Sequence, residues 1–208
     1  GDINVLADND VTFDATSDVT STSGNVTVTG DVDAAADSGG SDQGALTMSD
    51  GSLIDAGSGT VDMDANEDVS LSTVTTSNTV DATSDVGAIV DNTAAEAANI
   101  TGSTLDLDAA TGIGSGASLG GAADIDINGT LLSAVNSTSG NININEVDSV
   151  ALDDLVNTGR PVVLDAGAAI TDGNAADVVN ISAGTAEVRA VTGIGTGLAG
   201  DAGGIDTI

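Results

Sequence analysis

The chain has 208 residues, a formal net charge of −31 and 40% hydrophobic residues, yet Phe13 is its only aromatic residue and cysteine is absent. This hydrophobic content is not that of a disordered chain, and the lack of cysteine excludes a disulfide framework and a thiolate metal site. The acidity disfavours nucleic acid and anionic lipid as partners. There is no run of about 18 apolar residues, so we expect no membrane insertion.

Short segments in which aliphatic residues alternate with Asp, Asn or Thr recur along the chain. In chain order they are GDINV at 1–5, GNVTV at 24–28, GTVDMD at 59–64, STLDLD at 103–108, ADIDIN at 123–128 and GNININ at 140–145. Alternation with a period of two places the aliphatic side chains on one face of a strand and the polar ones on the other. The sequence therefore predicts a series of similar, half-buried strands.

Longer phrases also repeat. STSGNVTV at 21–28 returns as STSGNINI at 137–144, and FDATSDV at 13–19 returns as VDATSDV at 80–86. TLDLDAATGIGSG at 104–116 returns as TAEVRAVTGIGTG at 185–197. If the separations between these copies are six, three and four units, one unit has about 19 to 22 residues, which is typical of a solenoid coil.

Units this short cannot bury an apolar face alone, so each needs neighbours above and below. We predict an all-β fold, a parallel β-helix (β-solenoid) of about ten coils that forms one continuous segment over residues 1–208. An antiparallel sandwich or barrel is the alternative. Strand phrases open the chain (GDINV) and close it (GGIDTI). Because solenoid ends normally need a cap, we expect continuation of the same chain or end-to-end self-association.

The second half of the chain resembles the stalks of large bacterial exoproteins of the filamentous haemagglutinin-like type. The phrases that carry the resemblance are TGIGSG, NSTSGNINI, LDAGAAITDG and ISAGTAEVRA. The resemblance implies a right-handed parallel β-helix, export to the cell surface or the extracellular space, and a role in adhesion, in a matrix or in a filament. It covers roughly residues 100–208 well and the first half only loosely, and these phrases indicate fold and export class rather than a particular ligand.

Catalysis has few residue types to draw on. His, Cys, Lys and Tyr are missing, which removes the usual general bases, nucleophiles and Schiff-base formers. The adjacent carboxylates of Asp153 and Asp154 are typical of a solvated turn, and a negatively charged chain would repel an acidic glycan substrate. We therefore expect no enzyme activity and no organic cofactor.

A calcium site is the sharper hypothesis. DIDING at 124–129 matches the first six positions of an EF-hand loop, but the bidentate Glu of the twelfth position is missing. The favoured alternative is a strand with Ile125 and Ile127 inside and with Asp124, Asp126 and Asn128 on the outer face. These three residues are the candidate metal ligands, as part of an EF-hand or of another site built from the same outward oxygens.

Other acidic pairs raise the same question, and they are Asp8 with Asp10, Asp31 with Asp33, Asp62 with Asp64, and Asp106 with Asp108. Two carboxylates stacked about 4.8 Å apart on neighbouring coils repel by about 1 kcal/mol in water. We therefore expect Ca²⁺ or high salt to stabilise the stack.

Two function classes follow. In the first, the chain is a structural segment of an extracellular rod, stalk or filament, stabilised by cations. In the second, it is an adhesive or glycan-binding module whose ligand is a host or matrix glycan.

Overall fold

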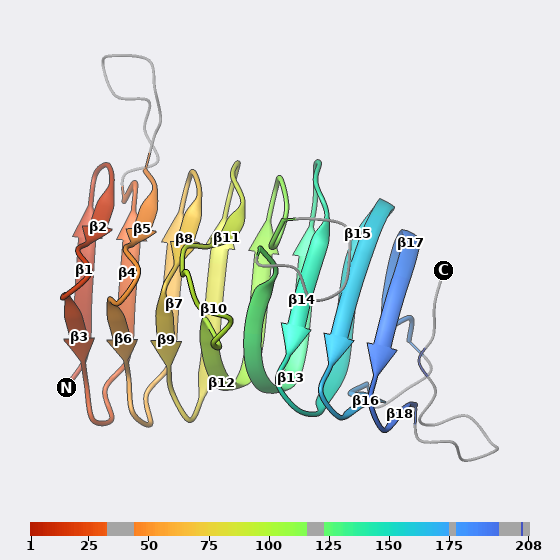
Figure 1. Cartoon of the computed structure of the whole chain (residues 1–208). Helices are drawn as coiled ribbons and strands as arrows, with labels where there is room; N and C mark the ends of the chain where they lie inside the picture. Colours follow the sequence, from red (N-terminus) through yellow and green to blue (C-terminus); the bar gives the residue numbers. More distant parts are fainter. Residues whose placement is uncertain (33–43, 116–122, 175–177, 196–204, 206–208) are drawn as a thin grey trace.

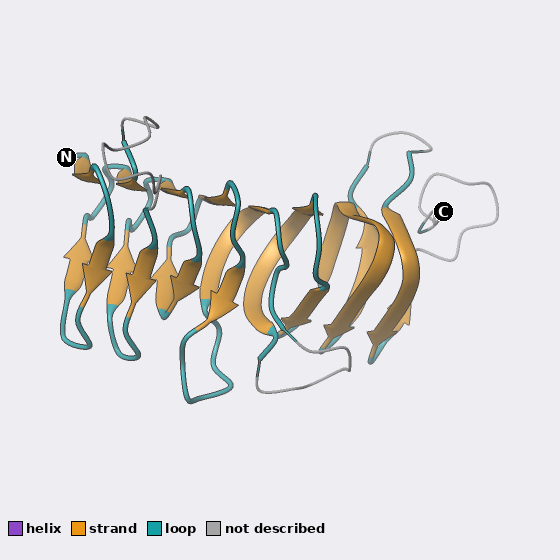
Figure 2. Ribbon diagram, turned by 90° about the horizontal axis from the view of Figure 1, so that it is seen from above, coloured by secondary structure: helices purple, strands orange, loops and turns teal. Residues whose placement is uncertain are grey.

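The computed structural model describes residues 1–32, 44–115, 123–174, 178–195 and 205. These residues form a parallel β-solenoid of about seven turns, an elongated stack with the N-terminus at one end and the last strands at the other (Figures 1 and 2). No helix occurs in the described residues, so none there is long and apolar enough to cross a membrane.

Three faces of short strands build the first turns. The first face holds β1 (Ile3–Ala7), β4 (Val26–Gly30), β7 (Val61–Ala65) and β10 (Thr79–Ser84). The second holds β2 (Val11–Phe13), β5 (Leu46–Met48), β8 (Val69–Leu71) and β11 (Ile89–Asp91), and the third holds β3 (Asp18–Thr20), β6 (Leu53–Asp55) and β9 (Thr73–Thr75). Each strand pairs in parallel with the equivalent strand one turn away, so the antiparallel alternative is wrong.

Longer strands, which continue from one face to the next, build the later turns. They are β12 (Ile100–Ala109), β13 (Ile125–Asn136), β15 (Val150–Ala166) and β17 (Ile181–Ala190), accompanied by the shorter β14 (Ile142–Glu146), β16 (Ala169–Asp172) and β18 (Gly193–Ile194). Because these strands turn corners, they join two of the faces into a single 14-stranded sheet.

The core is a set of apolar columns that run along the stack. One inward column of the first face reads Val5, Val28, Met63, Ala82, Leu107, Ala134, Leu155 and Ile181, each registered on the next. All of its members from Val28 onward are buried. The narrow interior is thus filled by small and medium aliphatic side chains, which explains why the chain needs almost no aromatic residues.

The predicted count of ten coils is wrong because the turns differ in length. Val61 pairs with Val80, and this interval along the chain agrees with the predicted unit. Val80, however, pairs with Leu105, and this interval is longer because the connection of residues 92–98 is inserted between β11 and β12. Insertions of this kind use residues without adding turns, so about seven turns account for the chain.

The repeated sequence phrases do not recur at intervals of whole turns, because their copies lie on different faces of the solenoid. STSGNVTV leads into β4 on the first face, whereas STSGNINI leads into β14, which lies in register with Ile113 and Ile89 of the second face. The phrase is therefore the signature of one corner and the strand that follows, and both the first and the second face use it. This is why dividing the separations by whole numbers overestimated the number of coils.

Two glycines show what these corners require. Gly57 and Gly140 have φ angles of 59° and 83°, a region that side chains disfavour. A Cβ atom would lie 2.2 Å from the Thr22 carbonyl oxygen at Gly57 and 1.9 Å from the Thr111 carbonyl oxygen at Gly140. The corners of adjacent coils are therefore stacked backbone on backbone, and only glycine fits there.

Candidate metal centre

The strand interpretation of residues 124–129 is confirmed. Ile125 and Ile127 are completely buried in the core, and they belong to β13, an extended strand that does not wrap around an ion as an EF-hand loop does. Asp126 and Asn128 therefore point to the outer side of the coil, as the period of two requires. Asn128 is half-buried and registered with Thr101 on the previous coil.

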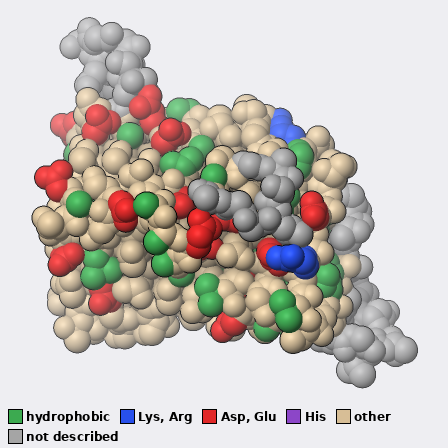
Figure 3. All heavy atoms as spheres, in the orientation of Figure 1, with side chains coloured by type: hydrophobic (Ala, Val, Ile, Leu, Met, Phe, Trp, Pro, Cys, Tyr) green, Lys and Arg blue, Asp and Glu red, His purple; other side chains and the backbone are tan. Residues whose placement is uncertain are grey.

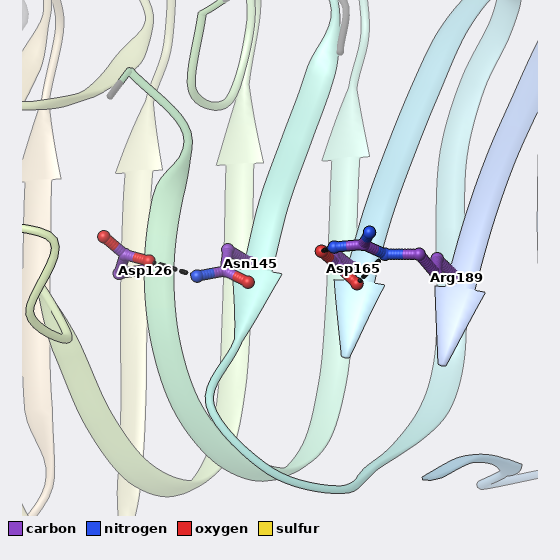
Figure 4. A network of polar contacts seen from close by, with 4 residues as sticks. All are labelled: Asp126, Asn145, Asp165 and Arg189. Carbon is purple, nitrogen blue, oxygen red and sulfur yellow. Dashed lines mark hydrogen bonds and ion pairs between the residues drawn. The ribbon is translucent and has the colours of Figure 1, made fainter. Parts of the chain in front are cut away.

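Asp124 and Asp126 are outward but not exposed, with exposed fractions of 1% and 3%. At Asp126, hydrogen bonds with neighbouring polar groups account for part of this burial. Its backbone N–H donates to Asn99 Oδ1 at 2.9 Å, and its Oδ1 accepts a 2.6 Å hydrogen bond from Asn145 Nδ2 (Figure 4). Burial raises the pKa of Asp126, the bond from Asn145 lowers it, and the charge of Asp91 raises it.

Glu96 completes a group of three carboxylates with Asp124 and Asp126. One carboxylate oxygen from each residue lies within 4.8 Å of the others. Oxygen ligands of calcium lie about 2.3–2.6 Å from the ion, so two ligands of one ion are separated by at most about 5 Å. These three residues can therefore bind the same cation, and Glu96, which the sequence did not single out, replaces Asn128 in the set.

Ile144 is registered with Ile125 of the previous coil. Asn143, one residue before Ile144, therefore lies beside Asp124 of this group. Its side chain is buried, and its Oδ1 has no hydrogen-bond partner in the described part of the chain. Its Nδ2 donates to the Ser115 carbonyl oxygen at 2.8 Å. An amide oxygen is a normal calcium ligand, so Asn143 is a further candidate ligand.

Glu96 reaches the group because its loop is closed at the base. Asp91 Oδ1 accepts hydrogen bonds from the Thr93 N–H at 2.8 Å and from Asn99 Nδ2 at 2.6 Å. We call the pair of Asp91 and Asn99 an Asp–Asn clasp. A second clasp joins Asp172 and Asn180, where Asp172 Oδ1 accepts from Asn180 Nδ2 at 3.0 Å.

A sequence signal for both clasps exists. DNTAAEAANI at 91–100 and DGNAADVVNI at 172–181 share Asp at the first position, an acidic residue at the sixth and Asn-Ile at the end. An aligned comparison of these two segments would have identified Glu96 as part of a repeated loop. In the second copy the acidic residue is Asp177, which lies outside the described residues.

The other predicted acidic pairs lie apart from this centre. Asp62, Asp81 and Asp106 are registered on three consecutive coils of the first face, and we call them the acidic ladder. The pKa of Asp81 is raised first by burial and then by the charge of Asp106 and of other nearby aspartates. Burial and neighbouring aspartates also raise the pKa values of Asp64 and Asp108. Red side chains are spread over the face seen in Figure 3.

The remaining predicted acidic residues that the structure describes are Asp8, Asp10 and Asp31. Asp8 and Asp10 are exposed, and Asp10 Oδ1 accepts the Ala45 N–H of the next coil at 3.0 Å. Asp31 lines a groove with Asp64 and Asp85, and its predicted partner Asp33 lies outside the described residues.

The adjacent carboxylates of Asp153 and Asp154 lie within β15, so the expected turn is wrong. They sit just after the point where the register between β13 and β15 shifts. Asp154 Oδ1 accepts a hydrogen bond from Ser133 Oγ at 2.6 Å, and Asp153 is exposed. An irregularity in the strand, rather than a turn, therefore places two carboxylates next to each other.

The two arginines lie on the last coils. Arg189 forms an ion pair with Asp165 of the preceding coil, with Nε 2.8 Å from Oδ1 (Figure 4). Hydrogen bonding and charge of Asp165 raise the pKa of Arg189. Arg160 donates to the Thr138 carbonyl oxygen. Both arginines thus connect one coil to the coil before it.

One buried acid lies inside the stack. Glu146 has the same parity as Ile142 and Ile144, is registered with Ile127 and Ala166, and is 1% exposed. Its Oε2 accepts the Gly129 N–H at 3.0 Å and its Oε1 accepts the Asp148 N–H at 3.1 Å. Burial outweighs these bonds and raises the pKa of Glu146 to about 7.

Comparisons with known proteins add no assignment. No family model matches the chain, and no curated protein or solved structure matches it either. The architecture is that of a β-helix repeat, while membership of the filamentous haemagglutinin-like family is a proposal.

Proposed function

We propose that this chain is a structural segment of a bacterial extracellular rod, stalk or filament of the filamentous haemagglutinin-like type, stabilised by divalent cations. The observation that carries the proposal is the unbroken column of registered inward residues from Val5 to Ile181. Each coil of such a stack contacts only its neighbours, so length can be added without redesigning the core. Such a column supports a role in which the protein supplies reach.

The surface supports a spacer more than an adhesive module. Glycan sites commonly use exposed aromatic rings, and the single aromatic residue, Phe13, is buried in the core. Acidic side chains are distributed along the stack from Asp2 to Glu187, which keeps a rod soluble and discourages lateral association.

A glycan array at physiological calcium tests this role against the adhesive alternative. We expect no specific, saturable binding to any glycan. Saturable binding to one class of glycan would replace the spacer function by an adhesive one.

The cation part of the proposal is supported by Glu96, Asp124 and Asp126, whose carboxylate oxygens lie within 4.8 Å of one another. Three carboxylates this close repel one another unless a cation or a proton is shared between them. A cation that binds only the folded state stabilises it by mass action. We therefore expect about 1 mM calcium, the range that extracellular modules use, to raise the melting temperature, and a chelator to reverse the increase.

Glu96→Gln is the sharpest variant for this test. Glu96 is exposed, so the change leaves the core intact and removes one charged ligand. Glu67→Gln is the matched control, because the Glu67 side chain is not one of the three grouped carboxylates. We expect the calcium-dependent increase in melting temperature to fall in Glu96→Gln and to persist in Glu67→Gln. An equal increase in both variants would show that calcium acts on the general surface charge and not at this group.

A further inference from the structure

The first part of the loop of residues 92–98 is hydrogen-bonded to coils that precede it. Asn92 Nδ2 donates to the Met48 carbonyl oxygen at 2.8 Å, and the Ala94 N–H donates to Asp50 Oδ2 at 3.3 Å. Both acceptors lie two coils before the loop, since β5 pairs with β8 and β8 pairs with β11. The loop therefore reaches back over the coil that lies between.

The middle of the same loop reaches in the other direction. The carboxylate of Glu96 lies within 4.8 Å of those of Asp124 and Asp126, which belong to the following coil because β12 pairs with β13. The chain has no lysine or histidine, and its two arginines, Arg160 and Arg189, bind groups elsewhere. No side chain therefore neutralises these carboxylates, and a cation or a proton has to come from the solvent.

A neutral oxygen lies beside the three carboxylates. The Asn143 side chain points to the same outer side as that of Asn145, two residues on, whose Nδ2 donates to Asp126 (Figure 4). The Ser115 carbonyl oxygen can only accept, so it faces Asn143 Nδ2 and leaves Oδ1 on the other side of the amide. This Oδ1 is buried and has no hydrogen-bond partner in the described part of the chain. Because a buried oxygen without a partner costs free energy, the site favours a ligand that supplies one.

We infer that Glu96, Asp124, Asp126 and Asn143 form a calcium site, in which the ion fastens the loop of residues 92–98 to the coils that follow it. The inference rests on the proposed stabilisation by cations, and it names the ion, its neutral ligand and the segment that the ion holds. Hydrogen bonds fix one part of the loop to earlier coils, and the ion fixes the other part to later ones.

The loop and its ion together connect coils that do not touch one another. The third-face column that runs past all of these anchors consists of Ile54, Val74, Ile100, Ile127 and Glu146, one residue from each of five consecutive coils. In a solenoid each coil otherwise contacts only its neighbours. The calcium-bound loop is thus a brace along the stack, placed where the short strands of the first turns give way to the long strands from β12 onward.

The ligand set favours calcium over magnesium. Three carboxylates and one amide supply about four to seven oxygens, depending on whether each carboxylate binds with one atom or with both. Asp124, Asp126 and Asn143 are at most 3% exposed, so an ion bound there gives up most of its water. Calcium accepts about six to eight oxygens in a flexible geometry, whereas magnesium retains several waters. Glu96 is the exposed member of the set, so the ion enters from its side.

Cleavage by a glutamate-specific protease tests whether calcium fastens the loop. The glutamates of the chain are Glu67, Glu96, Glu146 and Glu187, and only Glu96 lies in the loop. We expect the 208-residue chain to be cut after Glu96 in chelator and about tenfold more slowly when free calcium is about ten times its Kd. Magnesium at the same concentration should give no protection. Glu67, in a turn outside the group, reports the activity of the protease in each buffer.

Calcium titration by calorimetry tests the neutral ligand. Asn143→Ala removes Oδ1 and should weaken calcium binding by at least about tenfold, a loss that even residues supporting a ligand cause. Asn143→Asp also loses the bond to the Ser115 carbonyl group, but it restores the oxygen and adds charge, so it should bind calcium at least as tightly as the wild type. A purely structural role of Asn143 would weaken both variants.

Asn136→Ala is the matched control. Asn136 is also a buried asparagine whose Oδ1 has no partner among the described residues, but it ends β13, whereas Asp126 lies near the start of that strand. This variant should keep the wild-type affinity for calcium. Circular dichroism checks that each variant is folded before the titration.

Three results would each overturn the inference. They are cleavage after Glu96 at the same rate with and without calcium, equal protection by magnesium, and equal calcium affinity of Asn143→Ala and Asn136→Ala. The proposed function fails separately, because its cation part requires only that calcium raise the melting temperature.

Discussion

The two halves of the solenoid share one architecture but satisfy their buried polar groups differently. In the described residues before Asn99, every buried polar side chain is a hydroxyl, and these are Ser21, Ser52, Ser72, Thr76 and Ser84. From Asn99 onward, every one is an amide or a carboxylate, and these are Asn99, Asp124, Asp126, Asn136, Asn143, Glu146, Asn157, Asp165 and Asn180. The change coincides with the long, corner-turning strands and with both Asp–Asn clasps.

The difference teaches how insertions are accommodated. A hydroxyl has one proton to donate, and Ser84 Oγ donates it to the Glu67 carbonyl oxygen at 2.6 Å. An asparagine can bridge several groups, and Asn157 binds the Pro161 carbonyl oxygen, the Gly140 carbonyl oxygen and Asn136. The C-terminal half therefore holds its loops with multiple bonds, and it should be more sensitive to mutation, pH and ions.

The largest loss of stability should come from removing an asparagine side chain that bonds several groups. Asn157 and Ser84 occupy the same column of the first face, which also contains Ala65 and Ala109, so alanine fits sterically at both positions. Asn157→Ala loses three hydrogen bonds and leaves buried carbonyl groups unpaired, so we expect a loss of about 3 kcal/mol in the free energy of unfolding. Ser84→Ala should lose about 1 kcal/mol.

Urea unfolding followed by circular dichroism measures both losses. If Ser84→Ala destabilises the protein as much as Asn157→Ala, the two halves do not differ in the way proposed.

The next effect concerns pH and Glu146, which has no counterpart among the described residues of the first half. Its folded pKa of about 7 lies above the unfolded value of 4.5. The folded state therefore holds the proton more tightly, and this contribution to stability is fully present below pH 4.5 and is lost as the pH rises to about 7. The loss has an upper limit of about 3 kcal/mol.

Glu146→Gln isolates this contribution because it cannot ionise. The difference in unfolding free energy between wild type and Glu146→Gln should change between pH 4.5 and 7, in favour of the wild type at the acidic end. Glu187→Gln makes the same substitution at an exposed position and serves as the control. A flat difference for Glu146→Gln would show that the carboxylate is solvated when ionised.

Much of the fold could be predicted from alternation alone. The period of two in GNVTV and ADIDIN correctly assigns Val26, Val28, Ile125 and Ile127 to the interior. The same parity in ININE also places Glu146 inside, but a lone Glu at the end of a strand phrase reads as solvated. The number of turns could not be predicted, because inserted loops such as 92–98 have no hydrophobic period.

Only part of the candidate metal site could be predicted from the sequence, for a related reason. Asp124 and Asp126 share a strand phrase, so their common face follows from local geometry. Glu96 and Asn143 join them from other coils, and the loop that carries Glu96 is linked to β13 by Asn99, which also forms the clasp with Asp91. Contacts between coils depend on register across insertions, which the sequence of one coil does not contain.

The smallest effect should come from the acidic ladder of the first face. Asp81 lies between Asp62 and Asp106 on adjacent coils, and burial and these charges raise its pKa. Asp81→Asn keeps the size of the side chain and removes the repulsion, so it should stabilise the fold by about 0.5 to 1 kcal/mol at low salt. The gain should shrink as salt is added, because screening already relieves the wild type. Asp14→Asn, in an exposed turn, should change stability far less. Chemical unfolding at two ionic strengths measures the effect, and a gain that does not depend on salt would mean that burial rather than repulsion limits this ladder.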